Sequence, residues 1–77
     1  MLVSVGFDNY INSDKVISIA RNDSAPIRRM VQAAKDSGLA IDATCGKKTK
    51  SVIVMTSGHV ILSALTTETI QNRFISV

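Results

Sequence analysis

A cluster of basic residues surrounds one glycine in the second half of the chain. The segment Gly46-Lys47-Lys48-Thr49-Lys50 places three lysines within four residues. Ammonium groups, hydroxyls and backbone N–H groups hold phosphate backbones in proteins, and a glycine allows a ligand to approach the backbone closely. The spacing is not that of a P-loop, which needs Gly-x-x-x-x-Gly-Lys-Ser/Thr. The segment predicts phosphate binding, and the alternative is a solvated turn whose charges keep strands from pairing edge to edge.

Other basic side chains could extend this positive region. Arg28 and Arg29 lie at the start of a predicted helix, and Lys15 and Arg21 bracket a predicted strand. No acidic residue occurs in positions 43–67, and the whole chain carries a net charge of +3. That charge is compatible with an anionic partner without identifying one. We therefore expect one clearly positive region, although charged side chains on a helix are also typical of a solvated face.

Three further residues have the types used in nucleophilic catalysis, namely Asp42, Cys45 and His59. A cysteine nucleophile needs a base within hydrogen-bonding distance, and nothing in the spacing places His59 beside Cys45. With one cysteine and one histidine, the chain can form neither an internal disulfide nor a structural zinc site. The sequence therefore predicts no enzyme, no metal, no cofactor and no small-molecule substrate.

The elements that position these groups follow from the spacing of apolar residues. Residues 2–7 and 15–20 predict two strands that pair as a hairpin with a long tip. A helix is predicted over residues 25–37, because Ser24 is a good N-cap and Pro26 stands in the first turn. The apolar stripe of this helix consists of Ile27, Met30, Val31 and Ala34.

The second half of the chain predicts three antiparallel strands in a meander. We expect these strands over residues 39–44, 50–56 and 59–65, joined by turns at 45–49 and 57–58. The basic segment would then form the tip of a hairpin.

A short C-terminal helix is predicted after Thr66, with Ile70 and Phe74 on one face. Together these elements predict an α+β fold in a single domain over residues 1–77. Its core would be a small, twisted, mainly antiparallel β-sheet with one packed α-helix and the short C-terminal helix.

The apolar content is high for so short a chain. Of the 77 residues 45% are hydrophobic. In a chain of this length apolar burial and lost conformational entropy nearly cancel. Residues 52–55 and 60–62 are apolar on both strand faces, and one helix cannot cover both faces of a sheet. Either the C-terminal helix or another subunit covers the second face, and we predict a homo-oligomer.

The N-terminal segment lacks a basic stretch followed by a long apolar one, and no apolar run reaches 18 residues. Neither a signal peptide nor a membrane partner is therefore predicted. A lone cysteine is most simply a reduced thiol, so we expect a cytoplasmic protein.

Several ordered blocks of the sequence resemble one known family. They are Val5-Gly6-Phe7 with Asn9, Ser24-Ala25-Pro26-Ile27-Arg28-Arg29-Met30, Ile41-Asp42-Ala43-Thr44 with Gly46 and the basic residues 47, 48 and 50, and His59-Val60-Ile61-Leu62-Ser63-Ala64. These blocks are similar to those of the RemA-like family of bacterial extracellular matrix regulatory proteins. The similarity runs without gaps from about Val5 to Phe74.

The resemblance implies a DNA-binding transcriptional activator of biofilm matrix genes. It also implies a ring-shaped homo-oligomer that bends double-stranded DNA around its basic outer surface, in association with the nucleoid. The family's DNA-contacting basic residues correspond to Lys15, Lys47 and Lys48, with Lys50 continuing the cluster. To these we add Thr49, Arg28 and Arg29 as DNA-binding candidates.

Two departures from the family pattern are visible. The usual arginines are lysines at positions 15, 47, 48 and 50, and lysine neutralises phosphate without the planar fork of arginine. The usual tyrosine before the turn glycine is replaced by Cys45 in this sequence.

The alternative function is a ring-forming interaction module, or a nucleoid-architectural protein, that binds another anionic partner such as RNA, a protein or a metabolite.

Overall fold

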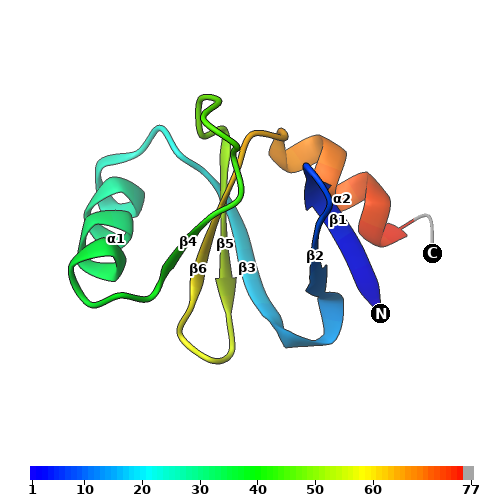
Figure 1. Cartoon of the computed structure of the whole chain (residues 1–77), viewed down its shortest axis with the longest axis horizontal. Coiled ribbons are helices and arrows are strands. Elements are labelled where there is room, and N and C mark those ends of the chain that lie inside the picture. The colour runs from blue at the N-terminus through cyan, green and yellow to red at the C-terminus, as the bar shows by residue number, and fades with distance from the viewer. Residues whose placement is uncertain (76–77) are drawn as a thin grey trace.

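A four-stranded sheet forms the middle layer of three in the structure, a computed structural model that describes residues 1–75 (Figure 1). The elements in chain order are β1 (Leu2–Gly6), β2 (Asn9–Asn12), the 3₁₀-helix η1 (Ser13–Lys15), β3 (Val16–Arg21), α1 (Ala25–Asp36), β4 (Ala40–Asp42), β5 (Ser51–Met55), β6 (Val60–Ser63) and α2 (Thr67–Ile75). The sheet order is β3-β5-β6-β4, while β1 and β2 pair separately. The β3–β5 and β5–β6 pairs are antiparallel, and β4 runs parallel to β6. The α+β class is confirmed.

Helix α1 covers one face of the sheet. Its buried residues Val31 and Ala34 pack against three sheet residues, Val52, Val60 and Leu62. The helix begins where the sequence predicts, because the Ser24 hydroxyl accepts a hydrogen bond from the backbone N–H of Ile27. The predicted apolar stripe therefore forms this interface.

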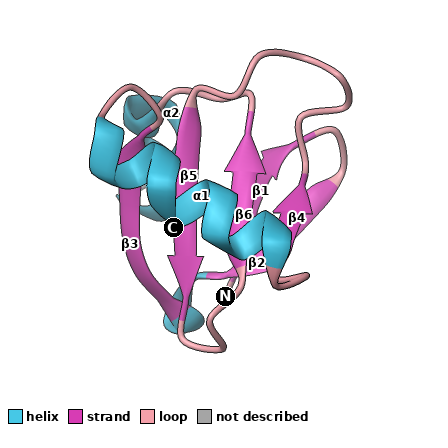
Figure 2. Ribbon diagram, turned by 90° about the vertical axis from the view of Figure 1, so that its left-hand side faces the viewer, coloured by secondary structure: helices cyan, strands magenta, loops and turns pink. Residues whose placement is uncertain are grey.

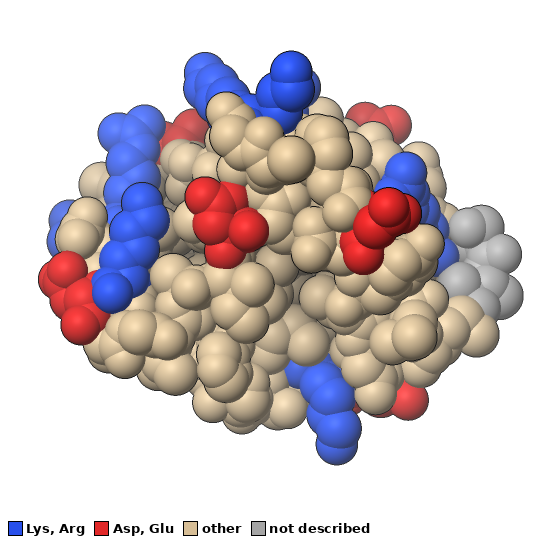
Figure 3. Space-filling view, in the orientation of Figure 1, with Lys and Arg blue, Asp and Glu red and all other residues tan. Residues whose placement is uncertain are grey.

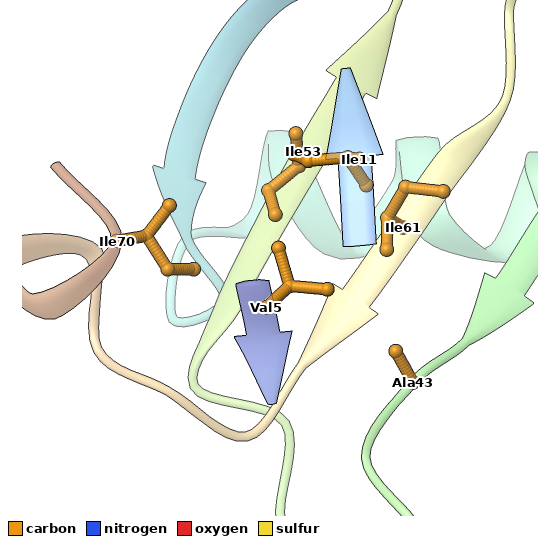
Figure 4. Packing of buried hydrophobic residues seen from close by; sticks show 6 residues of the cluster. All are labelled: Val5, Ile11, Ala43, Ile53, Ile61 and Ile70. Carbon is orange, nitrogen blue, oxygen red and sulfur yellow. The ribbon is translucent and has the colours of Figure 1, made fainter. Parts of the chain in front are cut away.

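The opposite face is covered by the β1–β2 hairpin together with α2. Val5 and Ile11 come from the hairpin and Ile70 from α2, and they pack against Ile53 and Ile61 of the sheet (Figure 4). Arg73 of α2 also donates a hydrogen bond to the backbone carbonyl of Ser4, 3.1 Å away. The N-terminal and C-terminal segments thus form one layer.

This layer corrects one part of the argument for an oligomer. The sequence left either the C-terminal helix or another subunit to cover the second face of residues 52–55 and 60–62, and both faces of these strands are covered within the chain. The reason is that the hairpin adds a second covering element beside the short C-terminal helix. The two-faced strands are therefore buried within one chain and do not require another subunit.

The predicted pairing of residues 2–7 with 15–20 is wrong. Strand β1 pairs instead with β2, a strand within what the sequence suggested was a long hairpin tip. Phe7 and Asp8 have left-handed backbone conformations, with φ of 53° and 63°, and allow a tight turn. The Asn9 side chain stabilises this turn by donating hydrogen bonds to the carbonyls of Gly6 and Phe7.

The predicted three-stranded meander is also wrong. β4 lies at the sheet edge beside β6, and β5 lies between β6 and β3. The segment 43–50 is thus a crossover loop from an edge strand to an inner strand, and the basic residues do not form a hairpin tip. Strands do form within the three predicted segments, but apolar periodicity does not specify which strands are neighbours.

The C-terminal helix is confirmed as α2. The Thr66 hydroxyl accepts a hydrogen bond from the Thr69 backbone N–H at 3.1 Å, as expected of an N-cap. Ile70 is fully buried, and Phe74 packs against the same core. Neither α1 nor α2 has the length and apolar character needed to cross a bilayer.

Candidate nucleic-acid interface

The loop over residues 43–50 is fixed at its first end by hydrogen bonds around Asp42. The Asp42 carboxylate accepts from the backbone N–H of Thr44 at 2.8 Å and from its hydroxyl at 2.6 Å. Thr44 is buried, and its carbonyl accepts from the backbone N–H of Lys47 at 3.0 Å. Cys45 and Gly46 complete this turn with φ of 53° and 81°. This turn directly precedes the lysines.

The second end of the loop is fixed to the sheet. The backbone N–H of Lys50 donates to the carbonyl of Ser63 at 2.8 Å. Directly after it, Ser51 stands opposite Arg21 of β3 in the strand register. The loop is therefore anchored at both ends, while Lys47, Lys48 and Lys50 are exposed.

Lys48 and Lys50 contribute to a groove of about 690 Å³ in which distant parts of the chain converge. It lies between the end of β3, the start of α1, the basic loop and the start of α2. Its lining residues are Arg21, Asn22, Asp23, Arg28, Lys48, Thr49, Lys50, Thr66, Thr67 and Glu68. The lining therefore contains four cationic side chains and two carboxylates.

Charges within the groove favour an anion. Asp23 is paired with Arg21, and its backbone carbonyl accepts a hydrogen bond from Arg28 at 3.3 Å. Both α1 and α2 begin beside the groove, and helix N-termini carry partial positive charge and backbone N–H donors. The groove thus combines cationic side chains, hydroxyl groups and oriented peptide dipoles.

The structure brings four of the seven predicted site residues together, namely Arg28, Lys48, Thr49 and Lys50. Lys47 stands in the same loop outside the groove lining, and Arg29 lies on an exposed part of α1. Figure 3 shows basic side chains over the loop at the top of the view and others over α1 at its left.

Lys15 lies far from this group. It precedes Val16 at the start of β3, whereas the groove includes Arg21 at the strand's end. Five residue steps of about 3.3 Å separate these two ends by about 17 Å. One continuous patch from Lys15 to Lys50 is therefore not formed on one chain.

Sequence reasoning noted Arg21 but did not assign it to the site. Only the β3–β5 register places Arg21 beside the start of β5, where the lysine loop ends. The contribution of Thr66 and Thr67 was missed for the same reason. No local pattern in the sequence indicates that the α2 N-terminus meets the loop.

The residues considered for catalysis are separated. Cys45 lies in the loop before β5, and His59 lies in the turn after it, at the opposite end of the strand. The Nδ1 atom of His59 lies 2.7 Å from the Oγ atom of Ser57, its hydrogen-bond partner. Across residues 1–75, no three histidine, cysteine or acidic side chains are grouped as a metal site would require.

The hydrogen bonds of Asp42 give the loop anchor a pH dependence. Bonds from the Thr44 hydroxyl and backbone N–H, with a smaller contribution from Lys35, lower the pKa of Asp42 below its ordinary value of 3.8. A lowered folded-state pKa stabilises the fold above the unfolded value, and this stability is lost as the pH falls through the folded value.

We predict that Asp42→Asn loses less stability than the wild type on going from pH 5 to pH 3. The asparagine keeps an acceptor for Thr44 but has no proton to gain. Urea unfolding at pH 5, 4 and 3 measures this difference, and the other carboxylates contribute equally to both proteins. Identical pH dependences in the two proteins would contradict the role assigned to the Asp42 anchor.

Comparison with known proteins gives the family of the chain. The family model described as RemA-like, extracellular matrix regulatory protein A-like, matches residues 2–74. The chain belongs to the RemA-like family. Extracellular matrix regulatory protein A of Bacillus subtilis is 50% identical to this RemA-like chain over 72 residues, covering 94% of the chain and 81% of the relative.

Two further relatives, both described as putative regulatory proteins, come from other bacteria. A protein of Lachnoclostridium phytofermentans is 56% identical over 72 residues, which cover 94% of this chain and 79% of the relative. A protein of Synechococcus elongatus is 49% identical over 75 residues, covering 97% and 86%. The resemblance stated from the sequence blocks is thereby confirmed as family membership.

Proposed function

We propose that this RemA-like chain is a DNA-binding transcriptional activator of extracellular-matrix genes and acts as a ring-shaped homo-oligomer. The observation that supports DNA binding is the groove in which Arg21, Arg28, Lys48 and Lys50 converge from three separate elements. The name of the B. subtilis relative supports the regulatory role. Such a regulator would work in the cytoplasm, at the nucleoid.

The groove suits the phosphate backbone better than base edges. Its cations, hydroxyls and helix N-termini are the groups that make phosphate contacts, which position a protein on DNA without reading sequence. The cations of the groove come from β3, α1 and the loop over residues 43–50, so the contact is not made by the exposed face of one helix. Sequence preference would then come from how easily the DNA bends.

Lys15 would provide a separate contact in this proposal. The length of β3, about 17 Å by the rise of a strand, separates it from the groove. Lys47 would contact the duplex from the exposed part of the loop.

In the homo-oligomer each subunit would contribute one groove, and the repeated grooves together would provide most of the affinity for duplex DNA. One subunit offers three or four phosphate contacts, which correspond to a slope of log Kobs against log [salt] of about −3. When several subunits bind one duplex, the later contacts become intramolecular, and the overall affinity rises without new chemistry.

Fluorescence anisotropy with a labelled 30-base-pair duplex tests this function. We expect binding at low salt, little dependence on sequence, and affinity that falls steeply as salt is raised. A wild-type protein that fails to bind duplex DNA at low salt would contradict the proposal. Equal or tighter binding to single-stranded RNA would favour another anionic partner.

A further inference from the structure

The two edges of the four-stranded sheet differ in shape. β3 forms one edge and β4 the other, and α1 lies across the face between them (Figure 2). Edge strands present backbone N–H and C=O groups that can pair with another chain. On β4, the side chain of Ile41 is 47% exposed, so this edge carries a protruding apolar group.

The β3 edge carries a hollow instead. A groove of about 610 Å³ runs between β3 and α2, with Val16, Ile17, Ile19 and Phe74 as its apolar lining and Arg21 among its polar residues. Ile17 is 65% exposed, although it belongs to a strand. It stands at a register shift, because Val16 pairs with Met55 while Ser18 pairs with Val54.

The strand register places Ile41 and the β3–α2 groove at the same position along the strands. Ile41 is opposite Ile61, Ile61 is opposite Ile53, and Ile53 is opposite Ile19. Residues that are opposite in a sheet point to the same face, which here is the face covered by α2. β3 and β4 also run in the same direction, because β6 is antiparallel to β5 and parallel to β4.

We propose that the β4 edge of one copy docks against the β3 edge of a second copy, and that Ile41 fills the β3–α2 groove. This inference rests on the self-association included in the proposed function and names the surfaces that would form it. A second copy placed beside the first without being turned over would keep the sheet faces aligned. Its β3 would pair in parallel with β4 of the first copy.

The length of β4 and the charge of Asp42 fit docking of β4 against the β3 edge of a second copy. β4 has three residues, and the regular part of β3 beyond the register shift is Ser18–Arg21. In this alignment the exposed Asp42 comes level with Ala20, one residue from Arg21. Arg21 is already paired with Asp23 in its own chain, so Asp42 would add a second carboxylate beside this guanidinium and favour this register.

Symmetric pairing through two identical edges fits less well. Two β3 edges paired antiparallel would bring Arg21 of one copy near Lys15 of the other, because Lys15 directly precedes the strand and Arg21 ends it. Two β4 edges paired together would leave the β3–α2 groove empty. Docking of unlike edges repeats from copy to copy, and it generates a ring when the rotation closes.

Two lysine substitutions test the docking without DNA. Ile41→Lys changes only the β4 edge and Ile17→Lys only the groove, and both residues are well exposed, so folding should survive. We expect each variant alone to run as a single chain near 8.3 kDa by light scattering. Leu2→Lys is the matched control, because Leu2 is 69% exposed on β1 and lies on neither edge.

Mixing the two variants gives the decisive result. The Ile41→Lys chain keeps a normal groove and the Ile17→Lys chain keeps a normal β4 edge. An equimolar mixture should therefore form a dimer of one copy of each, at about twice the mass of one chain. Circular dichroism of each variant verifies that it is folded.

The outcomes separate this inference from the proposed function. If the wild type assembles and both variants assemble equally well, the docking surfaces are wrong while self-association stands. If both variants are folded monomers that fail to combine, docking of unlike edges is wrong. A wild type that stays a single chain would overturn both the docking and the proposed self-association, and the anisotropy measurement would still test DNA binding.

Discussion

Replacing Lys48 and Lys50 together by alanine should weaken the binding of duplex DNA by about 60-fold per bound subunit at 0.1 M salt, because each lost phosphate contact removes roughly 0.9 of a decade there. Both side chains line the groove, and Lys50 is held at the sheet by the bond from its backbone N–H to Ser63. The slope of log Kobs against log [salt] should become shallower by about 1.8. Fluorescence anisotropy over a range of salt concentrations measures both quantities.

The control for this pair is a lysine outside the groove. Lys35→Ala removes one positive charge from the last turn of α1, and Lys48→Ala removes one from the groove lining. We expect Lys48→Ala to reduce the salt slope by about 0.9 and Lys35→Ala to leave it nearly unchanged. If the two single variants lose affinity equally, net charge rather than the groove determines binding.

Ile70→Ala should destabilise the chain by about 2–5 kcal/mol, the usual cost of truncating a fully buried isoleucine. Ile70 comes from α2 and packs with residues of the β1–β2 hairpin and the sheet. A domain of 77 residues is stable by roughly 4–12 kcal/mol, so much of the protein should unfold at moderate urea concentrations. Urea unfolding followed by circular dichroism, at one protein concentration, measures the change.

Ile75→Ala is the matched control on the same helix. Its side chain is 71% exposed, so the free energy of unfolding should change by no more than about 0.5 kcal/mol. Equal, small effects at the two positions would mean that α2 does not cover the second face of the sheet. The two-faced strands would then again require another subunit.

The sequence predicted best the elements whose signals are local. α1 follows from an N-cap, a proline and an apolar stripe within one segment, and the structure places it at Ala25–Asp36. α2 was predicted in the same way, from Thr66 and from two apolar residues one turn apart. In both helices the signals and the hydrogen bonds they predict lie within a few residues.

Strand order could not be predicted, because it depends on contacts between distant residues. The apolar runs at 52–55 and 60–62 indicate strands with two buried faces, but not which elements cover them. β2 was missed because Asn9–Asn12 is short and mostly polar. Only Ile11 in this strand is buried.

The candidate site was predicted in part for the same reason. The density of lysines at 47–50 is visible in the sequence, and the loop is exposed as expected. Arg21 joins them only through the β3–β5 register, and Lys15 is separated from them by the length of the same strand. Chain neighbours were therefore predicted correctly, and spatial neighbours were not.

The mass of the particle with and without DNA tests the central claim most directly. Multi-angle light scattering should give a homo-oligomer for the protein alone. Adding a 30-base-pair duplex at low salt should yield one complex with several chains per duplex, which dissociates as salt is raised. A particle that stays at 8.3 kDa in both conditions would contradict an assembled, DNA-binding regulator.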